Sequence, residues 1–166
     1  GCSKSDKADA APKDYTKILH DARPDEDNEY YMIFSPGEDG KFTAQYGYSD
    51  SYDAAQLDEE IRNMLLPLLN LEEDMYTDFA ASVSGMMVQS YGIAIVKPAE
   101  GKQQAVSEAL DAYVQSQMQS MEHYLEDQYQ IAASSHISTA PTGEVILVCC
   151  ENPEAVMNAI KTALAA

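Results

Sequence analysis

Basic residues are scarce in this sequence. Its 166 residues include 10 lysines and arginines against 28 aspartates and glutamates, which gives a formal net charge of −18. No lysine or arginine occurs between Gln103 and Ile160. Nucleic-acid binding needs cationic side chains that displace counterions from phosphates, and adhesion to anionic lipid head groups needs the same charge. The composition therefore predicts that neither nucleic acid nor an anionic lipid surface is a direct partner.

Long hydrophobic runs are also missing. The longest run, MLLPLLNL, contains Pro67 and is far shorter than the roughly 20 apolar residues that span a bilayer. The sequence therefore predicts no transmembrane helix.

Cysteine is rare, with three in the chain: Cys2, Cys149 and Cys150. There is no CxxC motif, so zinc binding and thiol redox chemistry have no support. Cys149 and Cys150 are neighbours in EVILVCCE, which is typical of a strand, and neighbouring strand residues point to opposite faces. We expect one of them to be buried. A vicinal disulfide is the alternative, and it carries strain.

Catalytic and metal-binding motifs are absent from the sequence. His20, His123 and His136 fall in different predicted elements, without a metal-ligand spacing. The segment SVSGM is not a nucleophile elbow because position 81 is alanine, and there is no glycine-rich phosphate loop. We therefore expect no catalytic residue, no metal ligand and no cofactor, and we predict that the protein is not an enzyme.

The acidic segment DEDNE at residues 25–29 resembles the start of a calcium loop. The match ends at the sixth position, Tyr30, where an EF-hand has glycine, and at the twelfth, Pro36, where it has glutamate. A solvated charged loop is the main interpretation, with a weak surface calcium site as the alternative.

Residue periodicity predicts a single α+β domain over residues 15–166. We expect helices at residues 15–22, 51–71, about 101–125 and 153–165, with Pro67 kinking or ending the second. Strands are expected in pairs at residues 30–48, 76–98 and 136–150. Hairpin connections favour a two-layer fold, in which a largely antiparallel sheet of about four to six strands carries helices mainly on one face.

Residues 1–14 have the composition of a flexible tether, closed by Pro12. Their Gly-Cys-Ser start resembles the mature end of a bacterial lipoprotein, in which a signal peptide is removed just before a lipid-carrying cysteine. The resemblance implies that Cys2 is the lipid anchor; an unmodified exposed cysteine is the alternative. Gly1 is either the residue before the cleavage site or a cloning remnant.

The second half of the chain resembles a known family. GIAIVKPAEGKQQAVSEALDAYVQSQ, followed by GEVILVCCENPEAVMNAIKTAL, is similar to uncharacterised putative lipoproteins of clostridia-like Gram-positive bacteria, a domain of unknown function. The similarity covers roughly residues 64–165. It implies a lipid-anchored α+β domain at the extracytoplasmic face of the cell membrane, and it brings no functional residues. The predicted hairpin near residues 30–48 departs from the family, which usually looks more helical there.

The chain has eleven tyrosines, and two groups of them are candidate binding surfaces. Tyr46, Tyr48 and Tyr52 cluster around a predicted strand end, where Tyr46 and Tyr48 are expected to share a face; Tyr124 and Tyr129 follow the long helix. Tyrosine is a good contact residue because its body is apolar and its tip is polar. The alternative is that these rings pack on the sheet or beneath a hairpin.

Taken together, these features predict a non-catalytic binding module that recognises a protein or peptide partner in the cell envelope. The alternative is a solute- or glycan-binding lipoprotein, and an enzyme with an unfamiliar site comes third. A binding module needs an exposed apolar patch, a solute binder needs a deep pocket with convergent polar groups, and an enzyme needs a cleft holding titratable groups.

Overall fold

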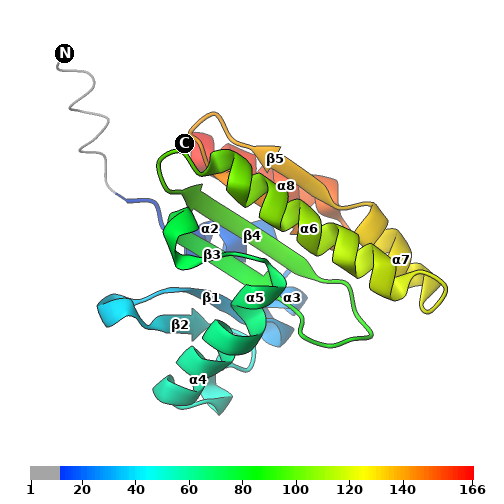
Figure 1. Cartoon of the computed structure of the whole chain (residues 1–166), viewed down its shortest axis with the longest axis horizontal. Helices are drawn as coiled ribbons and strands as arrows, with labels where there is room; N and C mark the ends of the chain where they lie inside the picture. The colour runs from blue at the N-terminus through cyan, green and yellow to red at the C-terminus, as the bar shows by residue number, and fades with distance from the viewer. Residues whose placement is uncertain (1–11) are drawn as a thin grey trace.

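A six-stranded sheet organises the molecule. In the computed structural model, which describes residues 12–166, the strand order is β2-β1-β3-β4-β6-β5 and every neighbouring pair is antiparallel (Figure 1). The strands are β1 (Ile33–Pro36), β2 (Phe42–Gln45), β3 (Tyr76–Val83), β4 (Gly92–Pro98), β5 (His136–Thr139) and β6 (Val145–Cys149). The predicted α+β class and antiparallel sheet are confirmed. Cys2 and most of the predicted tether lie outside the described residues.

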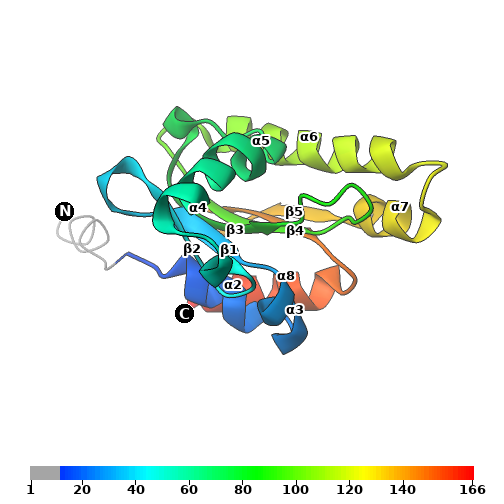
Figure 2. The same ribbon diagram turned by 90° about the horizontal axis from the view of Figure 1, so that it is seen from below.

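Helices cover both faces of this sheet. The helices α4 (Ala54–Glu60), α5 (Leu66–Leu68) and α6 (Gln103–Met121) lie on one side, and α2 (Tyr15–Ala22), α3 (Asp25–Tyr30) and α8 (Pro153–Ala165) lie on the other (Figure 2). The prediction of helices mainly on one face is therefore wrong. The physical reason is that β6 is buried at every position and β4 from residue 92 to 96, so both faces of the central strands need cover.

Alternation along β4 divides the core in two. Ala94 and Val96 pack in the cluster with α4, α5 and α6, whereas Ile93 and Ile95 pack in the cluster with α2 and α8. Cys149 belongs to the first cluster and Cys150 to the second, so the two side chains point to opposite faces as predicted. Both cysteines are buried and carry free thiols, not the vicinal disulfide that was the alternative.

The helix predicted over residues 51–71 begins after Asp53. The side chain of Asp53 accepts a hydrogen bond from the Gln56 backbone N–H, and the Gln56 side-chain oxygen accepts one from the Asp53 N–H, which together form a capping box. Leu57, Ile61 and Leu65 recur four residues apart, and all three are buried. They form one helix face, which joins the core cluster of Phe42 and Phe79 and packs α4 against β2.

The same helix widens before Pro67. A π-helical turn, η3 (Ile61–Leu65), joins α4 to α5, and the Leu66 N–H donates to the Ile61 carbonyl five residues earlier. A wider turn accommodates a proline, whose ring otherwise clashes with the preceding turn. Beside this turn, Met64 faces solvent, and Leu68, which helical spacing from Ile61 places on the buried face, is 36% exposed.

Three further boundaries differ from the prediction. Residues 25–30 form helix α3, not a charged loop, because three acids in its first turn suit the positive end of the helix dipole. The second strand of the pair predicted within residues 76–98 begins only at Gly92, after a loop. The long helix α6 ends at Met121, and α7 (Glu126–Ala133) follows as a separate helix. Within residues 12–166, no helix is long and apolar enough to cross a bilayer.

The buried carboxylate of Glu144 ties the start of the described chain to the β5–β6 turn. The Tyr15 hydroxyl donates to it at 2.6 Å, the Lys13 ammonium at 3.3 Å, and the Thr142 hydroxyl also donates. Burial raises the pKa of Glu144, but these hydrogen bonds outweigh burial and hold the pKa below its usual value. The carboxylate is therefore ionised at neutral pH, and α2 is held against this end of the sheet.

Candidate functional site

The tyrosines after β2 do not lie on one strand face. The chain turns off the strand at Tyr46 and Gly47, whose φ angles are +69° and +55°. Tyr46 packs on the His20 ring, with centroids 4.4 Å apart, whereas Tyr48 and Tyr52 line an open groove on another part of the surface. The expectation that Tyr46 and Tyr48 share a face is therefore wrong, because the strand ends at Gln45.

Tyr124 and Tyr129 lie far from that groove. They line a shallow hollow at the junction of α6 and α7, at the opposite side of the molecule from α4 (Figure 1). Tyr124 is 63% exposed and does not pack beneath a hairpin. The five predicted tyrosines therefore occupy three separate places: Tyr46 lies on His20, Tyr48 and Tyr52 line the groove, and Tyr124 and Tyr129 line the hollow.

The groove that holds Tyr48 and Tyr52 has a mostly apolar lining. It encloses about 430 Å³, and we call it the methionine–tyrosine groove. It combines residues of the α3–β1 connection, the segment after β2, the helix around η3 and the end of β3: Tyr30, Tyr31, Met32, Tyr48, Tyr52, Glu60, Met64, Leu65, Leu68, Val83, Ser84, Gly85 and Met86.

Its apolar side chains are unusually open to solvent. Tyr48 and Met64 are 61% and 60% exposed, and Met86, Met87 and Val88 are also exposed on the β3–β4 loop. Soluble monomers seldom leave large apolar side chains grouped in this way unless the surface contacts something. Methionine is common on surfaces that adapt to several partners because its side chain is unbranched and polarisable.

The β3–β4 loop presents its methionines from an ordered frame. The Ser84 N–H donates to the Tyr91 carbonyl at 3.0 Å, and the Ser84 hydroxyl donates to the Gln89 side-chain oxygen at 3.0 Å. The Met86 N–H donates back to the Ser84 hydroxyl at 3.2 Å. These bonds close the loop on itself, so its apolar residues project outward instead of continuing the strand.

Negative charge borders the methionine–tyrosine groove. Glu60 lines it, and an adjoining hollow of about 550 Å³, which shares Tyr52, Glu60 and Met64, adds Glu59. No lysine, arginine or histidine is among the residues that line either concavity. The groove is therefore apolar at its floor and acidic at its α4 edge.

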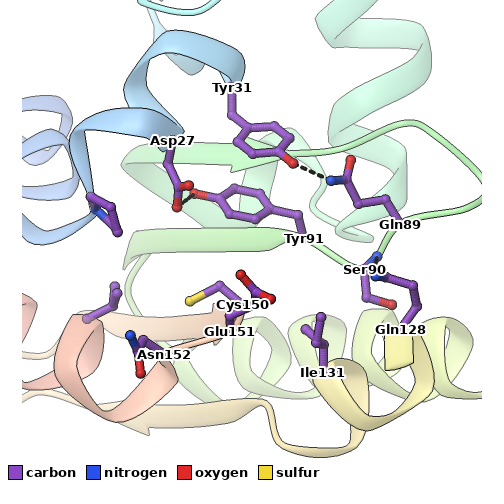
Figure 3. A pocket seen from close by; sticks show the side chains of 12 residues that line it. Asp27, Tyr31, Gln89, Ser90, Tyr91, Gln128, Ile131, Cys150, Glu151 and Asn152 are labelled. Atoms are coloured by element: carbon purple, nitrogen blue, oxygen red, sulfur yellow. Dashed lines mark hydrogen bonds between the residues drawn. The ribbon is translucent and has the colours of Figure 1, made fainter. Parts of the chain in front are cut away.

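A second, more enclosed concavity lies on the other side of Tyr31. This Tyr31 pocket has a volume of about 250 Å³ and is lined by Pro24, Asp27, Tyr31, Gln89, Ser90, Tyr91, Gln128, Ile131, Cys150, Glu151, Asn152 and Val156 (Figure 3). The Tyr31 and Tyr91 rings stack with centroids 4.0 Å apart and planes at 11°. Because Tyr31 also lines the methionine–tyrosine groove, its ring is a wall common to both.

Polar contacts hold the stacked rings in place. The Gln89 amide donates to the Tyr31 hydroxyl, and the Tyr91 hydroxyl donates to Asp27 Oδ2 at 3.0 Å (Figure 3). Burial raises the pKa of both tyrosines, and the Asp27 carboxylate raises them further. Both phenols therefore stay protonated at neutral pH; the Tyr91 hydroxyl donates to Asp27, whereas the Tyr31 hydroxyl accepts from Gln89.

Arg23 supports this pocket from inside the protein. It is only 4% exposed, and it donates to Asn28 Oδ1 at 2.6 Å, to the Ser82 hydroxyl at 2.8 Å, to the Tyr91 hydroxyl at 3.2 Å and to the Tyr31 carbonyl. It therefore fixes β3, β4 and the α3–β1 connection relative to one another.

Sequence reasoning missed Arg23 and the Tyr31 pocket. A single arginine in a charged segment carries no periodic signal, and its buried partners are distant in sequence. Residues 86–88 carried a usable signal, since an apolar run flanked by Gly85 and Gln89 fits an exposed loop as well as a strand.

The titratable groups near the Tyr31 pocket give no activated nucleophile. Burial raises the pKa of the Cys150 thiol to about 11, and the Asp27 and Glu151 charges add to the effect. The thiol is therefore protonated at neutral pH, which is the unreactive form. Among residues 12–166, no group of three or more histidine, cysteine, aspartate or glutamate side chains is placed to hold a metal ion.

A family model, domain of unknown function DUF4358, matches residues 49–151, and the chain belongs to this family. This confirms the predicted membership of a family of unknown function. No curated protein and no solved structure matches the chain. The match begins after the hairpin of β1 and β2, so the methionine–tyrosine groove combines family residues with Tyr30, Tyr31, Met32 and Tyr48 from the segment before it.

Proposed function

We propose that this protein is a lipid-anchored, extracytoplasmic binding module that docks a basic, amphipathic segment of a partner protein in the methionine–tyrosine groove. The observation that carries the proposal is the grouping of exposed Tyr48, Met64 and Met86 around one concave surface. Covering these side chains removes apolar area from water, which is the main driving force of most protein association.

The groove favours a single amphipathic segment over a large flat interface. Its volume of about 430 Å³ lies in the range of ordinary ligand sites and leaves room for several side chains of a partner. An amphipathic helix places side chains at i, i+3 or i+4, and i+7 in such a groove. The flexible methionines adjust to those side chains.

The acidic residues beside the groove favour basic residues at the flanks of the partner segment. Glu59 and Glu60 border the groove, and the whole chain carries a net charge of −18. Lysine or arginine beside the apolar residues of the partner is attracted by this field and speeds its encounter, whereas an acidic segment is repelled.

The proposed location rests on the start of the chain. A lipid on Cys2 fits the lipoprotein-like Gly-Cys-Ser sequence, and a protein so anchored meets partners in the cell envelope. In the full precursor, Cys2→Ala is expected to move the protein from the membrane fraction to the soluble fraction. Unchanged fractionation of this variant would show that the anchor lies elsewhere.

The second candidate, a solute- or glycan-binding protein, is supported by the polar Tyr31 pocket, which is more enclosed than the groove. Catalysis is not part of the proposal, because the Cys150 thiol beside this pocket is held in its protonated form.

Peptide binding tests the main proposal. We expect a fluorescently labelled amphipathic peptide of about 15 residues with lysine flanks to bind, and the same peptide with glutamate flanks to bind at least about tenfold more weakly. Tyr48→Ala is expected to weaken binding of the first peptide about thirtyfold, as removal of a central aromatic anchor does. Fluorescence anisotropy measures both effects.

Tyr124→Ala is the matched control for this substitution. Tyr124 is as exposed as Tyr48, at 63% against 61%, but it lies outside the groove. Its loss is expected to change the affinity less than about twofold. Equal effects of the two substitutions, or no preference for the basic peptide, would contradict docking in this groove.

A further inference from the structure

The Tyr31 pocket has a lining that the docking of an apolar segment leaves unexplained. Two carboxylates, Asp27 and Glu151, line it, and no lysine, arginine or histidine does. Ser90 also lines it and is only 2% exposed, yet its hydroxyl oxygen has no hydrogen-bond partner among residues 12–166. A buried hydroxyl without a partner is uncommon in folded proteins and marks a place where a partner is missing.

We propose that the Tyr31 pocket binds a compact organic cation, an ammonium or guanidinium group on a short alkyl stem. Asp27 and Glu151 supply opposite charge, and the stacked Tyr31 and Tyr91 rings supply aromatic surface that attracts cations. Ser90 Oγ accepts one N–H of the cation. Ile131 and Val156 provide apolar contact for the stem.

Arg23 does not compete with this cation. Its side chain is not among the lining residues, and its donors are directed to Asn28, Ser82, Tyr91 and the Tyr31 carbonyl. The Tyr91 hydroxyl lies between Arg23 and Asp27, receiving a hydrogen bond from the first and donating one to the second. Glu151 also lines the pocket, and it is exposed at its position before α8.

The cation has two sources, and the chemistry is the same for both. Because Tyr31 lines both concavities, a lysine or arginine side chain of a segment docked in the methionine–tyrosine groove reaches the pocket past this ring. This source rests on the proposed function. A free amine-bearing solute is the other source, and it does not depend on docking in the groove.

The free-solute arm uses n-butylammonium and its neutral analogue n-butanol. We expect n-butylammonium to shift the ring signals of Tyr31 and Tyr91 saturably in nuclear magnetic resonance titrations of the full chain. Butanol is expected to bind about tenfold more weakly, because it lacks the charge. Glu151→Gln is expected to weaken n-butylammonium binding about fivefold, whereas Glu154→Gln, at an exposed neighbouring position outside the pocket, leaves it unchanged.

The docked-segment arm replaces one lysine of the groove-binding peptide at a time with norleucine, which keeps the stem and removes the charge. One of these replacements is expected to weaken binding of the peptide to the unsubstituted protein about tenfold. The same replacement is expected to make no difference to binding by the Glu151→Gln variant. The proposal stands if either arm gives the expected result, and the arm that does identifies the source. It is overturned if butanol equals n-butylammonium and no lysine replacement depends on Glu151. If the peptide binds but neither n-butylammonium selectivity nor a Glu151-dependent lysine is found, this inference fails and the proposed function stands. If n-butylammonium binds but the peptide does not, the proposed function fails and this inference stands.

Discussion

Replacing Arg23 with methionine is expected to lower the free energy of unfolding by about 3 kcal/mol or more, since several buried acceptors lose their donor at once. Methionine keeps much of the apolar stem and removes the guanidinium. Ser82 is fully buried, and its hydroxyl would then lack its Arg23 donor, as would the Tyr31 carbonyl. Each buried polar group left unpaired costs about 1–3 kcal/mol.

Urea unfolding followed by circular dichroism measures this loss. Arg62→Met is the control, because Arg62 is exposed on the helix around η3 and contacts Asp58, the Gly40 carbonyl and the Phe42 ring. An exposed ion pair of this kind contributes about 1 kcal/mol at most. Arg23→Lys keeps the charge but not the branched donor geometry, so an intermediate loss is expected. Similar losses for Arg23→Met and Arg62→Met would contradict the buried role assigned to Arg23.

Gly47→Ala is expected to destabilise the protein by about 3 kcal/mol through two separate costs. The φ angle of Gly47 is +55°, a left-handed conformation that costs an alanine about 1–2 kcal/mol. A Cβ at this position would also lie 2.5 Å from the Met32 nitrogen and 2.7 Å from the Tyr31 carbonyl carbon. Both are backbone atoms, so the α3–β1 connection has to move, and with it one wall of the methionine–tyrosine groove.

Gly40→Ala separates the two costs. Gly40 has a φ of +73°, but nothing lies within 4 Å of a Cβ built there. Its alanine variant is therefore expected to lose only about 1–2 kcal/mol. Equal losses in the two glycine variants, measured by urea unfolding, would show that the close approach of Gly47 to Met32 is relieved without strain.

Much of the fold follows from local patterns that depend on few residues. The spacing of Leu57, Ile61 and Leu65 predicts one buried helix face, and the continuous apolar run at residues 93–96 predicts a central strand. That run also held the information that both faces of the sheet are covered, because a strand apolar at every position cannot leave one face in water. Helices were predicted mainly on one face because the hairpin connections were given more weight than this apolar run.

The candidate site is less accessible to such reasoning, because it joins segments that are distant in sequence. Tyr31 meets Tyr91, and Arg23 meets Ser82, only once β1 has paired with β3. Met64 is exposed within the widened turn before Pro67, and periodicity alone does not reveal that turn. Tyr48 was predicted as a contact residue because of its chemistry. The strand pattern indicated Tyr46 as its neighbour, whereas in the structure it lines the groove with Tyr52 and Met64.

The Glu144 contact has a consequence for orientation. Lys13 and Tyr15 are held beside Val145, which pairs with Val96, whereas the groove takes in Val83, which pairs with Gly92. The chain thus enters the domain at one end of β4, and the groove opens at the other, about 13 Å further along the strand. If the protein is tethered through Cys2, the end of the domain that holds Lys13 and Tyr15 faces the bilayer, and the methionines of the groove face away from it. A partner then reaches them from the far side, without approaching the lipid.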